Sequence, residues 1–486
     1  MKVLLCDVGS TYTKLTAVDI KASKIIGIAK SYTTIEEDVT IGYNKALKLL
    51  EEKIAGNYGI FNIKFSKKLC ASSAAGGLKI VSSGLVPDLT AKASRLAAAS
   101  AGGKIIKTYS YELTESDARA IEASKPDIIL LSGGIDGGNK DVLLHNATLV
   151  SKISGNFHTI IAGNKSAKDD ISNIFEALNK ESPIDDMESH RFDRQFKSPK
   201  NKIAKNIVFT ENVMPEFGVL NIEPVKEVIR NIFIKNIIAA KGLNNIQKIM
   251  DMEIIPTPLA VLEAFEILGQ SIGELMAYDL GGATTDVYSI ADGNPKGEDC
   301  FMNGLPEPYS KRTVEGDLGM RYSMEALLEQ INVPNFIKEY SLDEADYYEW
   351  VNICKEYKGN LPIARFEKYH PIDEAIAAEA VKISTNRHVG VKKKVMTLAG
   401  EAFLQEGKDL TGVKYLIGSG GAIVNSKNPK KILQNAIYTP ADLELLKPLK
   451  PKILLDKQNC ICAMGLLSRI DSKLAVKLMK ENFKEV

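Results

Sequence analysis

The sequence contains the stretch Asp7-Val-Gly-Ser-Thr-Tyr-Thr-Lys14 and, in its second half, a near copy of it, Asp279-Leu-Gly-Gly-Ala-Thr-Thr-Asp286. Each stretch follows an apolar run and precedes another, so each predicts a strand, a tight turn and a second strand. An aspartate enters each turn, and its glycines let backbone N–H groups approach an anion without a Cβ atom in the way. The repeat indicates two related halves, and two such turns together suit a polyphosphate and its metal ion.

The composition is that of an ordinary globular protein, with 486 residues of which 45% are hydrophobic and 25% charged. This length predicts about two to four domains. A net charge of +1 gives no electrostatic reason to expect nucleic acid or an anionic membrane as a partner. The start of the chain does not resemble a signal peptide, and no run of about 18 apolar residues predicts a transmembrane helix. A cytoplasmic protein is therefore expected.

Six cysteines are scattered along the chain, and no pair has the C-x-x-C spacing of a metal or redox site. Cys6 and Cys70 lie in strand-like apolar runs. Cys460 and Cys462 are closer together, but on a helix they would point to different faces. Buried structural thiols are therefore expected.

The order of apolar patterns predicts several domains. Three strands are expected at 2–7, 14–20 and 24–32, followed by an amphipathic helix near 41–54. From 67 to 212 strand-like and helix-like segments alternate, which predicts an inserted doubly wound α/β domain with a parallel sheet. The expected division is a first lobe (1–66), the insert (67–212), a helical return with a connecting helix (213–270), the start of a second lobe (271–322), a helical subdomain (323–411) and the end of the second lobe with a C-terminal helix (412–486).

The chemistry expected at the paired turns is phosphoryl transfer, which needs amide donors and carboxylates that hold a metal ion. The candidate carboxylates are Asp7 and Asp286, with Asp279, which are placed to hold Mg²⁺ through water and to orient an attacking water. Lys14 either approaches a phosphate or is merely solvated. Asp286→Ala is expected to abolish Mg²⁺-dependent hydrolysis and to leave the fold intact. The other candidate residues of the two turns are Gly9, Ser10 and Thr11, and Gly281, Gly282, Ala283, Thr284 and Thr285.

A third glycine turn, Gly418-Ser419-Gly420-Gly421, follows an apolar strand. Such a turn allows a flat base and ribose to lie against the backbone, although a bare strand–helix turn has the same pattern. The order DVGSTYTK, IPTPLAVLEAF, DLGGATTD and GSGGAIV resembles the phosphate-1, connect-1, phosphate-2 and adenosine motifs of actin, sugar kinases and heat-shock 70 chaperones. The resemblance implies a two-lobed actin-like (ribonuclease H-like) ATPase fold, with ATP and Mg²⁺ as ligands.

Four further segments resemble the MutL/GlmL family, whose name is shared with a DNA-repair protein of different fold. They are 71–78, 131–139, 211–216 and 313–321. The resemblance implies an ATPase that reactivates an adenosylcobalamin-dependent mutase, such as glutamate mutase or an aminomutase, by driving exchange of inactive cobalamin. It implies mutase subunits as partners. Whether the chain forms a homodimer is left open. Asp317 and Arg321 match a segment that borders the base in the chaperones, and Ala283 stands where many relatives have a third glycine.

Other functions stay open on this fold. A small-molecule kinase would need an aspartate base and a polar acceptor pocket, for which we find no motif. An activator ATPase of the acyl-CoA dehydratase type would need a cysteine pair to hold an iron–sulfur cluster, and Cys460 with Cys462 is a poor match. A clasp that binds nucleotide without turning it over is the non-enzymatic alternative.

The insert has a resemblance of its own. The segment 115–138 is similar to the late strand and glycine turn of cobalamin-binding domains, but the D-x-H-x-x-G ligand motif is missing. The chain is therefore expected to hold no cobalamin ligand of its own. The insert either copies the shape of a cobalamin subunit or packs only on its own chain, and the glycine loops at 74–77 and 132–138 could alternatively bind another anion.

Overall fold

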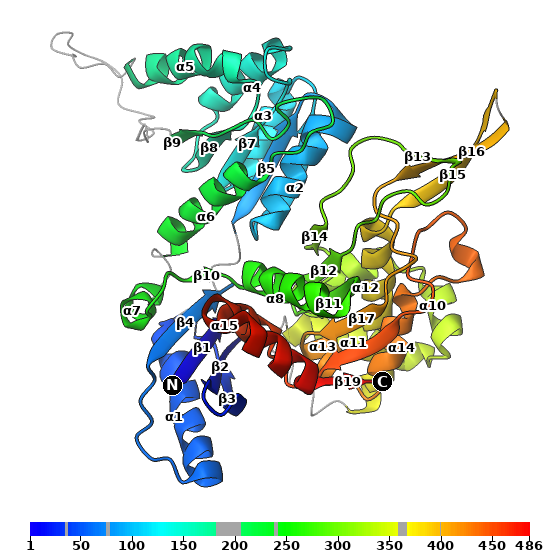
Figure 1. Ribbon diagram of the computed structural model, residues 1–486. Coiled ribbons are helices and arrows are strands. Elements are labelled where there is room, and N and C mark those ends of the chain that lie inside the picture. Colours follow the sequence, from blue (N-terminus) through cyan, green and yellow to red (C-terminus); the bar gives the residue numbers. More distant parts are fainter. Residues whose placement is uncertain (35–36, 74–77, 181–205, 238–241, 358–366, 399) are drawn as a thin grey trace, which may run out of the picture. The chain divides into compact units, whose positions relative to one another are not determined.

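The computed structural model describes residues 1–34, 37–73, 78–180, 206–237, 242–357, 367–398 and 400–486 (Figure 1). The chain divides into two compact units. Unit 1 contains Met1–Gly77 and Phe233–Val486, and unit 2 contains Leu78–Ile232. The glycine loop at 74–77 lies outside the described residues. In the part of the chain that is described, no helix is long and apolar enough to cross a membrane.

Unit 1 contains two main sheets and the helices that cover them (Figure 1). Its strands are β1 (Lys2–Val8), β2 (Tyr12–Asp19), β3 (Lys24–Tyr32), β4 (Lys67–Ser72), β10 (Ile255–Pro256), β11 (Leu275–Leu280), β12 (Thr285–Ile290), β13 (Cys300–Met302), β14 (Ser310–Glu315), β15 (Val391–Thr397), β16 (Gly400–Glu406), β17 (Tyr415–Ser419), β18 (Lys452–Asp456) and β19 (Phe483–Glu485). Its helices are α1 (Val39–Tyr58), α7 (Leu243–Ile249), α8 (Thr257–Ile272), α9 (Met324–Leu328), α10 (Val333–Tyr340), α11 (Glu344–Tyr357), α12 (His370–His388), α13 (Gly421–Val424), α14 (Pro429–Leu433) and α15 (Ile461–Asn482).

The two main sheets have the same strand order. Read from the antiparallel edge of each sheet, the order is β3-β2-β1-β4-β10 in the first and β14-β12-β11-β17-β18-β19 in the second. In each sheet three neighbouring strands pair antiparallel (β1, β2 and β3; β11, β12 and β14), and two other strands run parallel to the first of them. The second sheet is extended at one edge by β19. The repeat read from the two aspartate turns is thus a duplication of a whole sheet.

Helices α8 and α15 pack on each other and join the two sheets in one core (Figure 1). This core combines Leu5 of β1 and Ala277 of β11 with Phe265 of α8 and Leu467 of α15, all 1% exposed or less. Burial of apolar area on this scale is the main force that holds the halves together. The two sheets are therefore connected through this pair of packed helices.

Helix α1 illustrates how local sequence sets these elements. It begins after Asp38, whose side chain accepts a hydrogen bond from the Thr40 N–H at 2.7 Å, and it ends at Gly59 in the left-handed conformation with φ 65°. Leu50 and Ile54 are buried on the face that packs against the first sheet. The expected amphipathic helix at 41–54 is confirmed and extends beyond both predicted ends.

Unit 2 is a doubly wound α/β domain, as expected (Figure 1). Its parallel sheet has the order β6-β5-β7-β8-β9, which is the flavodoxin-like order of a doubly wound sheet. The elements are β5 (Lys79–Gly84), α2 (Lys92–Ser100), β6 (Lys104–Ser110), α3 (Glu115–Ser124), β7 (Ile128–Leu131), α4 (Asp141–Lys152), β8 (His158–Ile161), α5 (Lys168–Lys180), β9 (Asn206–Phe209) and α6 (Glu223–Ile237), the last of which runs across the boundary between the units.

Two segments differ from expectation. The strand β4 is expected to open the insert, but it pairs with β1 and belongs to the first sheet. Its apolar residues are buried there, beside the buried strand β1 to which it runs parallel. The first strand of the insert is instead β5. Val391–Thr397 and Gly400–Glu406, both expected within the helical subdomain, pair as β15 and β16. The sequence Val391-Lys-Lys-Lys-Val-Met-Thr is rich in β-branched and long side chains without a helical apolar stripe, and Gly400 (φ 120°) lies at the end of the turn.

Candidate functional site

The two aspartate turns have the same hydrogen-bond geometry. In the first, the Gly9 N–H donates to the Tyr12 carbonyl at 3.0 Å, and in the second the Gly281 N–H donates to the Thr284 carbonyl at 3.0 Å. These two amides therefore close the turns and are not free to donate to a ligand. The N–H groups of Ser10, Thr11, Gly282 and Ala283 find no acceptor within the described residues.

The hairpin registers place the charged residues in pairs. Asp7 lies opposite Lys14, and Asp279 lies opposite Asp286. Opposed residues of an antiparallel pair share one face of the sheet, so each pair presents its side chains together. Burial raises the pKa of Asp279 from 3.8 to about 6; the Asp286 carboxylate adds to this, and the Lys14 ammonium opposes it. The turns of the two sheets therefore contribute to one cluster of charges.

Asp7 is held from two sides. The Thr257 hydroxyl donates to its Oδ1 at 2.8 Å, and the Lys14 Nζ lies 3.9 Å from its Oδ2. Thr257 is the first residue of α8, so this contact ties the turn of the first sheet to the connecting helix. Burial disfavours the charged Lys14 side chain, but the carboxylates of Asp7 and Asp279 outweigh it and raise its pKa. Lys14 thus belongs to the carboxylate cluster and is not simply a solvated strand residue.

Asp286 is engaged by a residue that the sequence did not single out. Arg312 of β14 donates to its Oδ1 from Nε at 2.8 Å and from Nη2 at 2.5 Å. The Thr284 hydroxyl donates to its Oδ2 at 3.1 Å. Arg312 is 3% exposed, so a variant without the carboxylate removes the group that accepts two of its hydrogen bonds and balances its buried charge. The expectation that Asp286→Ala leaves the fold intact stays a prediction, and the buried pair favours a loss of stability in that variant.

The second turn is anchored by the segment that follows β14. The backbone N–H of Arg321 donates to the Gly282 carbonyl at 2.8 Å, and the Ser323 hydroxyl donates to the Ala283 carbonyl at 2.8 Å. The Thr285 hydroxyl donates to the Leu318 carbonyl at 2.5 Å. The segment 318–323 therefore fixes the shape of the turn through its backbone and one hydroxyl.

The charged groups of Asp317 and Arg321 have protein partners. The Arg321 guanidinium donates to both oxygens of Asp373, at 2.9 and 2.8 Å. Arg387 donates to both oxygens of Asp317 at 2.9 Å, and its hydrogen bond lowers the pKa of the Asp317 carboxyl. Their assignment to the base-binding wall stays a prediction. In the structure they join β14 and the segment after it to helix α12.

The third turn is tightly packed. A Cβ atom at Gly418 would lie 2.7 Å from Leu433 Cδ1, so this glycine allows close packing of α14 on β17. The Ser419 hydroxyl donates to Asp456 Oδ2 at 3.1 Å. At Gly420, φ is 83°, and a Cβ atom would lie 2.6 Å from Asp279 Oδ1. Gly420 thus brings the third turn against the carboxylate cluster, whereas Gly421 is exposed at the start of α13.

The donor set fits a magnesium ion held with its water and with phosphate. A carboxyl whose pKa is raised by neighbouring carboxylates, as that of Asp279 is by Asp286 and Asp7, is stabilised in its charged form by a divalent cation beside it. Among the described residues, no group of three or more His, Cys, Asp or Glu side chains has the geometry of a direct metal cage. Mg²⁺ is ordinarily held by one or two carboxylates together with water and substrate phosphates.

The duplicated sheet, with an aspartate turn after the first strand of each copy, places the protein in the expected actin-like fold class. The family model described as MutL protein matches residues 3–186 and 200–483. Protein MutL of Clostridium tetanomorphum is 42% identical over 486 residues, which is 98% of each chain. The chain belongs to the MutL protein family.

Several solved structures are similar at lower levels. They include nucleotide-free acetone carboxylase (11% identity, TM-score 0.39, covering 96% of this chain and 70% of that one). Component A of (R)-2-hydroxyglutaryl-CoA dehydratase from Acidaminococcus fermentans matches at 9% identity and a TM-score of 0.28, covering 99% of each chain. Xylulose kinase from Bifidobacterium adolescentis matches at 10% identity and a TM-score of 0.30, covering 99% of this chain and 93% of that one. Likenesses at this level carry no argument about activity.

Proposed function

We propose that this chain is an ATPase that reactivates an adenosylcobalamin-dependent mutase, such as glutamate mutase or an aminomutase, by driving exchange of inactive cobalamin. The observation that supports the ATPase most is the cluster formed by Asp7, Lys14, Asp279 and Asp286, which draws on the aspartate turns of both sheets. Family membership supports the mutase as the partner.

In this proposal the unengaged amides of the two turns receive the phosphate oxygens, because amides at a glycine turn attract anions. Asp7 and Asp286 would hold Mg²⁺ through water, which would supply positive charge beside the transferred phosphate. Asp279, whose pKa is raised by burial and by both other carboxylates, orients the attacking water. Arg312 keeps Asp286 in one orientation through two hydrogen bonds.

The proposed coupling to a partner uses the connecting helix. The Thr257–Asp7 hydrogen bond joins the first turn to α8, and α8 packs with α15 in the core shared by the sheets. Loss of the terminal phosphate between the turns would change how the sheets meet along these helices, which is a hinge motion. We propose that the mutase responds to this motion.

Release of ADP from the purified chain tests the proposal, measured with and without an adenosylcobalamin-dependent mutase and with a panel of sugars. The proposal predicts that the mutase accelerates release and that the sugars do not. Acceleration by a sugar, with transfer of phosphate to it, would identify a small-molecule kinase. A response only to an iron-dependent dehydratase would favour the activator ATPase.

A further inference from the structure

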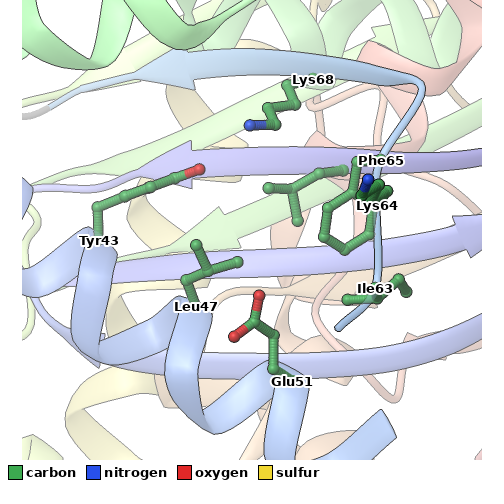
Figure 2. Close-up of a pocket in the computed structure, with 8 residues that line it drawn as sticks. Tyr43, Leu47, Glu51, Ile63, Lys64, Phe65 and Lys68 are labelled. Carbon is green, nitrogen blue, oxygen red and sulfur yellow. The ribbon is translucent and has the colours of Figure 1, made fainter. Parts of the chain in front are cut away.

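The cavity of about 320 Å³ between α1 and the first sheet is open to solvent (Figure 2). Its floor is packed, since Leu4 is 0% and Tyr43 is 2% exposed, so these side chains are out of a ligand's reach. Its charged residues Glu51 and Lys64 are exposed to solvent. The cavity therefore offers a ligand no buried polar group, whereas the second sheet contains a buried carboxylate beside the second and third turns.

This carboxylate is Asp456, which ends β18 and is 0% exposed. Strands β11, β17 and β18 are parallel neighbours, and their register places Ser419 beside Asp279. The carboxyl ends of parallel strands lie at one edge of a sheet, so Asp456 lies at the same edge as the second and third turns. Burial raises the pKa of Asp279 from 3.8 to about 6, and the Asp456 carboxylate adds to this from two strands away.

The Asp456 carboxylate accepts hydrogen bonds from two other elements. Its Oδ2 accepts from the Ser419 hydroxyl at 3.1 Å and from the Ile461 N–H at 3.2 Å. Its Oδ1 accepts from the Cys460 N–H at 3.1 Å and from the Asn482 side-chain amide at 2.5 Å. The donors belong to the third turn and to the two ends of α15. Because each buried donor would lose free energy without its acceptor, Asp456 fixes the third turn relative to α15.

The Ser419 hydroxyl is directed into the protein. Ser419 is 3% exposed, and its hydroxyl also lies 3.3 Å from Asn459 Oδ1. This hydroxyl therefore anchors the turn and is not a group that contacts a nucleotide. The next residue is Gly420, where φ is 83° and a Cβ atom would lie 2.6 Å from Asp279 Oδ1. At so close an approach, a shift of Ser419 moves the turn relative to Asp279.

We propose that Asp456 is a positioning residue for the nucleotide, because it fixes the third turn through the Ser419 hydroxyl before the base and ribose bind there. A turn that is already held in the binding geometry loses less conformational entropy when the ligand arrives. Loss of this anchor therefore weakens the binding of ATP and ADP although Asp456 itself does not touch the nucleotide. The assignment rests on the proposed ATPase, since it concerns the same nucleotide site.

Titration calorimetry with Mg²⁺ and ADP on the full chain, well below the midpoint of thermal unfolding, tests the assignment. Ser419→Ala and Asp456→Asn are each expected to weaken ADP binding about tenfold. The double variant should match the weaker of the two, because both changes remove the same link. If Asp456→Asn does not fold, Ser419→Ala alone decides.

The matched control is Asp409→Asn, in the same sheet but at the end away from the turns. Asp409 is 8% exposed, and its Oδ1 accepts from the Thr411 N–H at 2.8 Å, so this change also disturbs a buried carboxylate that holds backbone. Its own N–H donates to the Gly293 carbonyl, beyond the end of β12 that is opposite the second turn. Asp409→Asn is expected to bind ADP as the wild type does.

ATP hydrolysis gives a second measurement. In Ser419→Ala the KM for ATP should rise about tenfold and kcat should change less than KM, because the phosphates are held by the other two turns. Unchanged ADP affinity in Ser419→Ala, additive losses in the double variant, or the same loss in Asp409→Asn overturns the role of Asp456. A wild-type chain that binds no ADP contradicts the nucleotide site itself, and this role with it.

Discussion

The substitution Asp279→Asn separates the stability of the aspartate cluster from its proposed function. It keeps the shape of the side chain and removes a charge that burial and the Asp286 carboxylate both disfavour. In the absence of nucleotide and metal, the variant is therefore expected to be more stable than the wild type. The same change removes the carboxylate proposed to orient the attacking water, so ATP turnover should fall about 100-fold.

The size of the gain follows from the pKa of Asp279, which is raised from 3.8 to about 6. At 1.36 kcal/mol per pKa unit, the folded state of the wild type carries a penalty of about 3 kcal/mol when this carboxyl is ionised. Because the folded value lies above the unfolded one, the penalty is complete above pH 6, shrinks between pH 6 and 3.8, and is absent below pH 3.8. The gain in Asp279→Asn should follow the same course.

Urea denaturation of both proteins at pH 7.5 and at a pH below 3.8 measures this difference, and phosphate release from Mg²⁺-ATP measures turnover. The expected result is a gain of up to about 3 kcal/mol at pH 7.5 that disappears in acid, together with loss of turnover. If Asp279→Asn lowers stability at pH 7.5, or if the gain does not change with pH, the electrostatic reasoning is refuted. Full turnover in the variant would refute the role given to Asp279.

Four further changes have defined outcomes. Asp286→Ala removes the carboxylate that balances the buried charge of Arg312 and should lower the free energy of unfolding by about 3–5 kcal/mol. An unchanged urea midpoint would contradict the stabilising role of the buried pair. Gly420→Ala places a Cβ atom at a residue with φ 83° and 2.5 Å from the Leu280 carbonyl oxygen, and should lower the free energy of unfolding by more than about 1 kcal/mol. Gly56→Ala lies on the open face of α1 and should raise the free energy of unfolding by about 0.5–1 kcal/mol. Asp317→Asn should cost less than about 1 kcal/mol at pH 7, since its ion pair is partly exposed. Its arginine partner lowers the Asp317 pKa below 3.8, so this cost should vanish in urea titrations as the pH falls through 3.8 toward the folded value; a cost that persists in acid would point to packing.

The sequence predicted the elements that local pattern determines. The strands around Asp7 and Asp279 follow from apolar runs, and helix α1 follows from its apolar face. The location of β4 was missed because a buried parallel strand looks the same whichever sheet it joins. Which sheet β4 joins is decided by its long-range pairing with β1, and such pairing leaves no pattern in the local sequence.

The same limit applies to the site. The aspartates were found because they recur in a turn pattern, but Arg312 and Thr257 act through contacts between distant elements. Arg312 directly precedes the segment 313–321 that resembles the family, so the sequence indicates that this region matters. Nothing in the sequence indicates that Arg312 pairs with Asp286. The use of Gly9 and Gly281 to close their own turns depends on hydrogen bonds that no spacing reveals.

A crystal structure of the chain with Mg²⁺ and a non-hydrolysable ATP analogue tests the central claim most directly. The prediction is that the phosphates lie between residues 9–11 and 281–284, with Mg²⁺ held through water by Asp7 and Asp286. Nucleotide bound elsewhere, for example at the glycine loop 132–138 of unit 2, would contradict the assignment of the paired turns as the ATP site.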